Sequence, residues 1–294
     1  MKCQLCPRMC GVERDKGELG FCQSPHLPRV ARAALHFFEE PPISGTRGSG
    51  TVFFTGCPLG CVFCQNRAIR SPETGRETDP AALAEIFVDL ARRGAHNINL
   101  VTPTHVADTV AKALALAKPT LGIPVVYNCG GYERVETLRL LEGLVDIYLP
   151  DFKYISPDLA RAYSAAPDYA VHATAALGEM VRQVGAVRFD GDGMLQKGVI
   201  VRHLVLPGAR RDAMAVLDRI AATVPVSDIR LSLMSQYTPD FAPADAPSPL
   251  HRRVTQFEYQ SVLEHAMALG FEGYFQDRSS ANAAYTPDFE RSQP

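Results

Sequence analysis

Three cysteines stand close together and could hold one inorganic centre. Cys57, Cys61 and Cys64 are spaced Cys-x3-Cys-x2-Cys and follow a strand-like run at residues 50–54. A cubane iron–sulfur cluster normally takes four thiolates, so three leave one iron open to bind a small molecule and pass it an electron. Zinc usually takes four protein ligands, or three and a water, and this loop has no histidine. The loop therefore predicts a 4Fe–4S cluster with an open iron, and zinc is the alternative.

A second group of cysteines lies at the N-terminus, at Cys3, Cys6, Cys10 and Cys22. Residues 1–45 have little apolar content, so a metal must supply part of their stability. Four cysteines suit zinc and an auxiliary iron–sulfur cluster equally well. A second cluster would relay electrons or bind substrate, whereas zinc would only fold the segment.

The amino-acid composition limits which classes of protein the chain can belong to. The 294 residues are 46% hydrophobic and 21% charged, which is typical of a globular protein with a sizeable core. The net charge of −2 gives no reason to expect nucleic acid or an anionic membrane as partner. No apolar run is long enough to span a bilayer, and no apolar signal segment follows Met1. We expect a cytoplasmic protein whose clustered cysteines bind metal instead of forming disulfides.

From residue 50 onward the chain alternates between strand-like and helix-like segments. The expected strands are residues 52–55, 97–101, 124–128, 146–149, 199–206 and 229–234. The expected helices are residues 79–93, 104–118, 133–142, 157–164, 169–184, 210–223 and 254–269, with a hairpin at 188–196. Asp79 and Pro80 suit the N-cap and first position of the first helix.

Repeated β–α units of this length predict a parallel sheet covered by helices. Six units would make an α/β fold of the partial (β/α)6 barrel type, and a doubly wound open sheet is the competing topology. In both, functional groups gather at the carboxyl ends of the strands, where the three-cysteine loop lies. We expect a Cys-rich segment at 1–45, a main domain at 46–278 and a loose tail at 279–294.

The three-cysteine spacing after a first strand resembles the signature of the radical S-adenosylmethionine (SAM) superfamily. More closely, the chain resembles uncharacterised proteins related to pyruvate formate-lyase activating enzyme. The similarity extends from residue 1 to about 276 and rests on residues 3–11, 56–66, 94–105, 126–132, 146–154, 201–208 and 235–239.

The resemblance implies that the open iron chelates SAM and that an electron from the cluster cleaves its sulfonium. The products are methionine and a 5′-deoxyadenosyl radical, which abstracts hydrogen from a substrate. The nearest analogy is installation of a glycyl radical in a partner enzyme. Modification of another peptide or a small molecule is the alternative, and a flavodoxin or ferredoxin would be the reductant. A hypothesis of another class is a zinc-stabilised, non-catalytic α/β binding protein.

The resemblance also assigns residues to SAM. Phe63 matches an aromatic position near the adenine, with core packing as its alternative role. Asn66 matches an asparagine near SAM, and a turn or helix cap is the alternative. Gln236, followed by Tyr237, occupies a position of adenine or substrate contacts.

Three charged residues match SAM contacts on later strands. Asp151 and Lys153 form an Asp-x-Lys motif, and period-2 geometry puts both on one face. An ion pair that closes the rim is the alternative role. Arg202 resembles an arginine that meets the SAM carboxylate. Its strand places it in an apolar interior, where it needs an anion, either SAM or Asp151.

One stretch departs from the family pattern. Residues 99–105 carry no acid where many members hold the SAM amino group, so Thr102, backbone carbonyls or a distant carboxylate must serve. Cys129 ends a predicted strand and is a candidate hydrogen-atom donor, with packing as its alternative. His96 and His105 are expected to be cap or packing residues.

Overall fold

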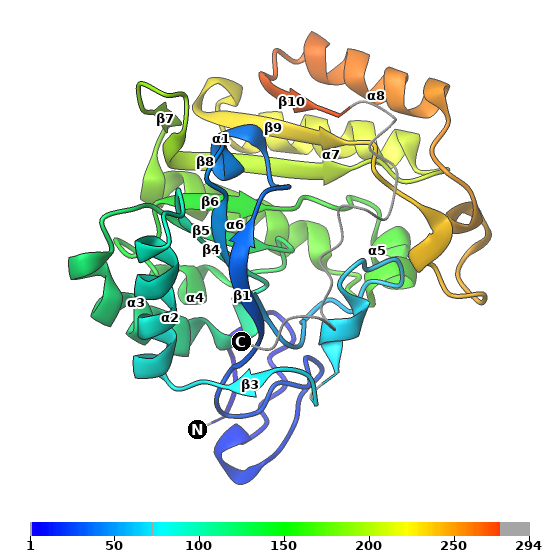
Figure 1. Cartoon of the computed structure of the whole chain (residues 1–294). Coiled ribbons are helices and arrows are strands. Elements are labelled where there is room, and N and C mark those ends of the chain that lie inside the picture. The colour runs from blue at the N-terminus through cyan, green and yellow to red at the C-terminus, as the bar shows by residue number, and fades with distance from the viewer. Residues whose placement is uncertain (1, 72, 277–294) are drawn as a thin grey trace.

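The structure is a computed structural model that describes residues 2–71 and 73–276. Over these residues the chain forms a mixed α/β fold around one sheet that is mainly parallel (Figure 1). The strand order is β10-β9-β8-β6-β5-β4-β2-β1-β3, with β7 paired to β8. Among the described strands this order is an open path, so the sheet does not close into a barrel.

The parallel strands follow the predicted β–α order. Pairing is parallel from β2 to β10, and β1, β3 and β7 pair antiparallel. The strands are β1 Arg29–His36, β2 Ser49–Phe54, β3 Arg76–Glu77, β4 Ile98–Val101, β5 Val125–Cys129, β6 Ile147–Pro150, β7 Arg188–Phe189, β8 Leu195–Leu204, β9 Ile229–Met234 and β10 Gly273–Phe275.

Eight α-helices are found among the described residues. They are α1 Pro41–Ser44, α2 Pro80–Arg92, α3 Ala107–Leu121, α4 Val135–Arg139, α5 Pro157–Ser164, α6 Tyr169–Val184, α7 Arg210–Thr223 and α8 Gln256–Ala268. Asp79 caps α2 as predicted, since its side chain accepts a hydrogen bond from the amide of Ala82. None of the described helices combines the length and apolarity needed to cross a membrane.

Several predicted boundaries were wrong. The helix predicted from residue 104 begins at Ala107, because Thr104–Val106 form a 3-10 turn, and it continues through Pro119. The helix predicted at 133–142 is only α4, a short helix of five residues. The tail predicted from residue 279 lies outside the described residues.

The sequence did not predict β1. This strand pairs antiparallel with β2, so a part of the N-terminal segment belongs to the main sheet. Its buried and half-buried positions do not alternate, and its pairing register shifts between Val30 and Arg32. Because period-2 alternation is the main signal of a strand, this strand was missed.

The two faces of the sheet carry different cores. Val125 and Tyr127 belong to the large cluster that packs against the helices. Val126 points the other way, into a smaller cluster with Ile43 of α1 and with Ile147, Leu149, Leu195 and Ile200. We call this second side the pocket face. The chain between β1 and β2, including α1, packs on it.

Candidate functional site

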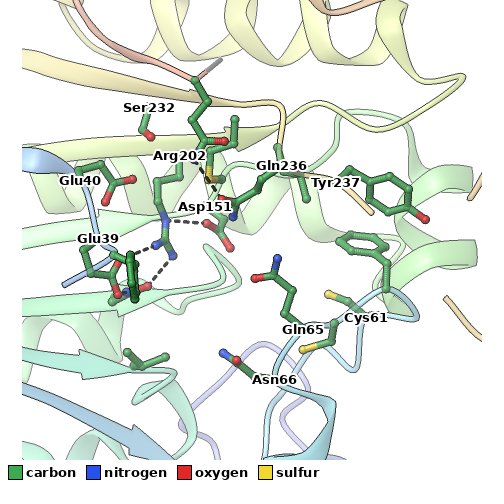
Figure 2. A pocket seen from close by; sticks show the side chains of 18 of the residues that line it. Glu39, Glu40, Cys61, Gln65, Asn66, Asp151, Arg202, Ser232, Gln236 and Tyr237 are labelled. Atoms are coloured by element: carbon green, nitrogen blue, oxygen red, sulfur yellow. Dashed lines mark hydrogen bonds and ion pairs between the residues drawn. The ribbon is translucent and has the colours of Figure 1, made fainter. Parts of the chain in front are cut away.

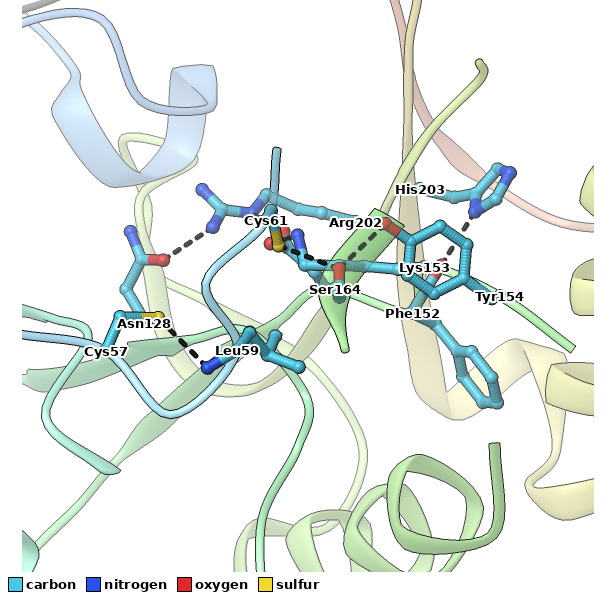
Figure 3. Close-up of polar contacts among 12 residues, drawn as sticks. Cys57, Leu59, Cys61, Asn128, Phe152, Lys153, Tyr154, Ser164, Arg202 and His203 are labelled. Atoms are coloured by element: carbon cyan, nitrogen blue, oxygen red, sulfur yellow. Dashed lines mark hydrogen bonds and ion pairs between the residues drawn. The ribbon is translucent and has the colours of Figure 1, made fainter. Parts of the chain in front are cut away.

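The three-cysteine loop begins where β2 ends. Gly56 has φ +88°, and a Cβ there would lie 2.5 Å from the carbonyl oxygen of Cys22. The backbone can therefore turn here only without a side chain. The Cys57 sulfur accepts a hydrogen bond from the amide of Leu59 at 3.4 Å, and the Cys61 sulfur lies 3.0 Å from the Ser164 hydroxyl (Figure 3).

The loop thiols suit a cationic centre. Burial raises the pKa of Cys57, and the neighbouring Cys61 raises it further. Burial, followed by Cys61 and Cys57, raises the pKa of Cys64 to about 12. Three thiolates here would repel one another unless a cationic centre balanced their charge. The three sulfur donors, together with the tight backbone turn that Gly56 allows, therefore fit an iron–sulfur cluster.

The side chains of the described residues are not arranged to coordinate a metal ion. Within residues 2–71 and 73–276, no three His, Cys, Asp or Glu side chains are placed so that they could hold a metal ion. Both the Cys57, Cys61 and Cys64 set and the N-terminal set therefore stay predictions.

A pocket of about 500 Å³ opens beside the loop (Figure 2). It collects most of the residues that the sequence assigned to SAM, although they come from four separate parts of the chain. The predicted residues that line it are Cys61, Phe63, Cys64, Asn66, Asp151, Lys153, Arg202 and Gln236.

Asp151 is the centre of a charge network in this pocket. One carboxylate oxygen accepts from the Lys153 ammonium at 2.5 Å and the other from Arg202 Nε at 3.0 Å. Burial alone would raise the pKa of Asp151, but Lys153 and Arg202 outweigh it and hold the pKa below its usual value. Burial lowers the pKa of Lys153, but the charges of Asp151 and Cys61 outweigh burial and raise the pKa above its usual value. All three side chains therefore stay ionised.

Arg202 has further partners that sequence reasoning missed. Its guanidinium donates to Glu39 at 3.3 Å and to the Asn128 side chain at 2.5 Å. Glu39 also accepts from Asn99 at 3.0 Å. The sequence predicted SAM or Asp151 as the anion that pairs with Arg202. In the structure Arg202 pairs with Asp151 and also with Glu39. The pair of acids at positions 39 and 40 before a proline was the available sequence signal.

The polar backbone around Asp151 is held by Tyr169. Its hydroxyl lies 2.9 Å from the carbonyl oxygens of Gly130 and Asp151 and accepts from the amide of Lys153 at 3.0 Å. Gly131 has φ +79°, and a Cβ there would lie 2.0 Å from the Asp151 carbonyl oxygen. The ends of β5 and β6 are thus fixed tightly together, which orients the Asp-x-Lys motif.

The uncharged residues assigned to SAM lie at the cysteine end. Phe63 is buried and meets Tyr237 edge-on at 6.1 Å between ring centroids. Asn66 precedes a 3-10 turn without a capping hydrogen bond from its side chain, so the cap role is not seen. Gln236 accepts from Gln276 at 3.0 Å.

Among the predicted residues, Cys129 and Thr102 do not line the pocket, and neither do Cys57 or the N-terminal cysteines. Cys129 is buried in the cluster that faces the helices, so the structure does not bring it to the candidate site. Burial, with a contribution from Glu133, raises the pKa of Cys129 well above its usual value. Thr102 has φ +59° and also lies outside the pocket lining. His105 is buried and bonds the Thr55 carbonyl oxygen at 2.8 Å, which agrees with a packing role.

The N-terminal cysteine segment contacts the loop directly. The Cys57 amide donates to the Cys22 carbonyl oxygen at 3.3 Å. Arg8 donates to the carbonyl oxygens of Pro58, at 2.8 Å, and Ser164, at 3.1 Å. These bonds link the first cysteine group to the second.

Known proteins resemble this chain in sequence and in fold. Residues 51–189 match the family described as "Radical SAM superfamily". The chain is 30% identical over 275 residues to the uncharacterized protein MJ0674 of Methanocaldococcus jannaschii, covering 90% of this chain and 74% of that protein.

Two solved structures are similar at low identity. A radical SAM methyltransferase from Sphaerobacter thermophilus matches with TM-score 0.51 and 14% identity, over 77% of this chain and 66% of that one. Streptococcus suis SuiB bound to S-adenosylmethionine matches with TM-score 0.47 and 10% identity, over 75% of this chain and 47% of that one. This chain thus spans less than two thirds of either. The methyltransferase similarity shows a shared fold.

Proposed function

Because residues 51–189 form a radical SAM domain and the chain belongs to that superfamily, we propose that it cleaves SAM to generate a radical. The observation that carries the proposal is the pairing of the three-cysteine loop with a charged pocket. Cys61 and Cys64 line that pocket together with Asp151, Lys153 and Arg202. Cys57, Cys61 and Cys64 would hold the 4Fe–4S cluster.

When bound, the cluster would supply the electron that cleaves the SAM sulfonium, and the radical chemistry on the substrate would follow from that cleavage. Lys153 stays cationic beside Asp151 and favours the anionic thiolates, since its charge lowers the pKa of Cys64 against the burial that raises it. Asp151 anchors both Lys153 and Arg202. Phe63 and Tyr237 offer an aromatic wall suited to adenine.

The test is SAM cleavage by protein reconstituted anaerobically with iron and sulfide. With dithionite as reductant, we expect 5′-deoxyadenosine and methionine in equal amounts. Cys61→Ala should lower the rate by about 100-fold or more, because one cluster ligand is lost. Absence of 5′-deoxyadenosine from protein with about four irons per chain, or an unchanged rate in Cys61→Ala, would refute the proposal. Zinc as the sole bound metal would instead favour the non-catalytic binding protein.

The substrate belongs to the same proposal. Phe37 and Phe38 line the pocket and are 49% and 59% exposed, which suits docking of a polypeptide. We therefore favour activation of a partner enzyme by a glycyl radical, with another peptide or a small molecule as the alternative. Electron paramagnetic resonance of the partner after turnover would detect the glycyl radical. A flavodoxin or ferredoxin in the cytoplasm is the proposed reductant.

The N-terminal cysteines are proposed to hold zinc or a second iron–sulfur cluster. Burial raises the pKa of Cys6 to about 12, so a bound cation is needed to keep its thiolate. Iron and zinc per chain, measured before and after Cys6→Ala/Cys10→Ala, separate the two. The open sheet, with helices along one face, is proposed to curve as a partial barrel around the pocket.

A further inference from the structure

The pocket carries more carboxylates than cations. Its lining includes three acids, Glu39, Glu40 and Asp151, and two permanently charged bases, Lys153 and Arg202. Both oxygens of Asp151 are occupied by the two bases, and Glu39 is paired with Arg202. His36 also lines the pocket, but burial lowers its pKa and keeps it neutral. Among the described residues Glu40 is therefore the lining acid without a direct ion pair, although the charge of Arg202 and a hydrogen bond from Ser232 both act on it.

Glu40 is buried with one oxygen unused. The residue is only 9% exposed, and its Oε2 has no hydrogen-bond partner among the residues that the structure describes. Burial raises the pKa of Glu40, which Arg202 offsets only in part. A buried carboxylate oxygen that is left unpaired is costly, so a bound donor would relieve the cost.

The backbone fixes Glu40 in this place. Its carbonyl oxygen accepts from the amides of Ile43, at 2.8 Å, and Ser44, at 3.1 Å, at the start of α1. Ile43 in turn is fully buried on the pocket face. The main chain that carries the Glu40 side chain is therefore held beside the pocket.

Glu40 lies at the opposite end of the pocket from the thiols. Figure 2 shows Glu39 and Glu40 together on one side, Cys61 on the other, and Arg202 with Asp151 between them. In the proposed function SAM occupies the cysteine end, so the acid end is left for the substrate. A single free carboxylate oxygen is too few ligands for a metal cation, which takes six or more oxygens or several carboxylates.

We propose that the substrate carries a protonated amine or guanidinium group, which donates to Glu40 while the rest of the substrate extends toward the cysteine end. This inference rests on the proposed function for the position of SAM. A cation is favoured over a neutral donor because it balances the third carboxylate and makes the stronger, charge-assisted hydrogen bond. The group belongs either to a small molecule or to a lysine or arginine side chain of a peptide.

The experiment measures binding without turnover, on cluster-loaded protein with SAM and no reductant. The probes are n-butylammonium, n-butylguanidinium and the neutral n-butyramide, together with the peptide acetyl-Gly-Lys-Gly-amide. We expect at least one cation to bind about tenfold tighter than butyramide, as one charged hydrogen bond allows. If the peptide binds more tightly than butylammonium, the cationic group belongs to a peptide side chain. If butylammonium binds more tightly, the cationic group belongs to a small molecule.

Variants test the role of Glu40. Glu40→Gln should weaken cation binding on the order of tenfold and leave butyramide unchanged, whereas Glu40→Asp keeps the charge and part of the preference. Glu85→Gln, at an exposed position on α2, is the matched control and should change nothing. Circular dichroism melting curves verify that each variant is folded. Equal binding of cations and butyramide, or cation binding that survives Glu40→Gln, would overturn the inference.

The outcome is separable from that of the proposed function. Cation binding that depends on Glu40, in protein that forms no 5′-deoxyadenosine on reduction, would refute radical chemistry and keep the acid site. Formation of 5′-deoxyadenosine without any cation preference would keep the chemistry and overturn the acid site.

Discussion

Asp151→Asn removes the charge at the centre of the pocket network and nearly preserves its shape. The side chains of Asp151, Lys153 and Arg202 are 19%, 18% and 16% exposed, so the network is largely desolvated. The substitution leaves Lys153 without its ion-pair partner. Arg202 keeps Glu39 and Asn128.

The expected cost follows from this burial. Removing one partner of a buried ion pair costs about 3–5 kcal/mol, because the other charge remains unpaired. The partners that Arg202 keeps put the expected loss at the lower end, about 3 kcal/mol. For a chain of this size that corresponds to a fall in Tm of roughly 6–12 °C.

The pH dependence gives an independent signature. The folded-state pKa of Asp151 lies below the unfolded value of about 3.9, so its ionisation stabilises the fold above that pH. This stabilisation is lost as the pH falls through the folded-state pKa. The difference between the parent protein and Asp151→Asn should therefore be constant from about pH 7 to pH 5 and shrink below about pH 4.

Urea unfolding followed by far-ultraviolet circular dichroism measures the free energy of unfolding at each pH. The control is Asp158→Asn, which breaks an ion pair with Arg161 whose side chains are 89% and 62% exposed. Exposed pairs contribute at most about 1 kcal/mol. A loss in Asp151→Asn no greater than in Asp158→Asn, or one that does not depend on pH, would refute the assignment of Asp151 as the buried anchor.

Two further substitutions test the cysteine loop and the core. Gly56→Ala places a Cβ 2.5 Å from the Cys22 carbonyl at φ +88°, so we expect a loss of about 2–3 kcal/mol and less bound iron, measured by urea unfolding and iron analysis. Normal stability and iron content would contradict the close contact. Cys129→Ala should cost about 1–2 kcal/mol as a core deletion yet keep 5′-deoxyadenosine formation within about twofold. Loss of that activity in a folded variant would restore Cys129 as a hydrogen-atom donor.

Local patterns were sufficient to predict one half of the pocket. Asp151 and Lys153 share a face through period-2 geometry, and parallel strands bring their carboxyl ends to one edge. Arg202 was expected on the interior face of its strand, in need of an anion, and the structure pairs it with Asp151. These inferences need only strand direction and alternation, which the sequence carries.

The acid half could not be predicted in the same way. Glu39 and Arg202 are 163 positions apart, and no local pattern reports a contact at that separation. Two acids followed by prolines are typical of an exposed connector. They are buried because β1 pairs with β2, and that pairing gave little period-2 signal. Cys129 differs from its neighbour by one position of alternation: Asn128 lines the pocket, whereas Cys129 packs in the cluster that faces the helices.

The N-terminal segment completes the site from both ends. Before β1, the Cys22 carbonyl oxygen accepts from the Cys57 amide and so supports the thiol loop. After β1, the same segment delivers Glu39 and Glu40 to the far end of the pocket. Because one strand joins the two contacts, a displacement of β1 along β2 would move the acids and the support of the thiols together. The segment therefore belongs to the pocket itself, and the separation between the cysteine end and the acid end is set by β1.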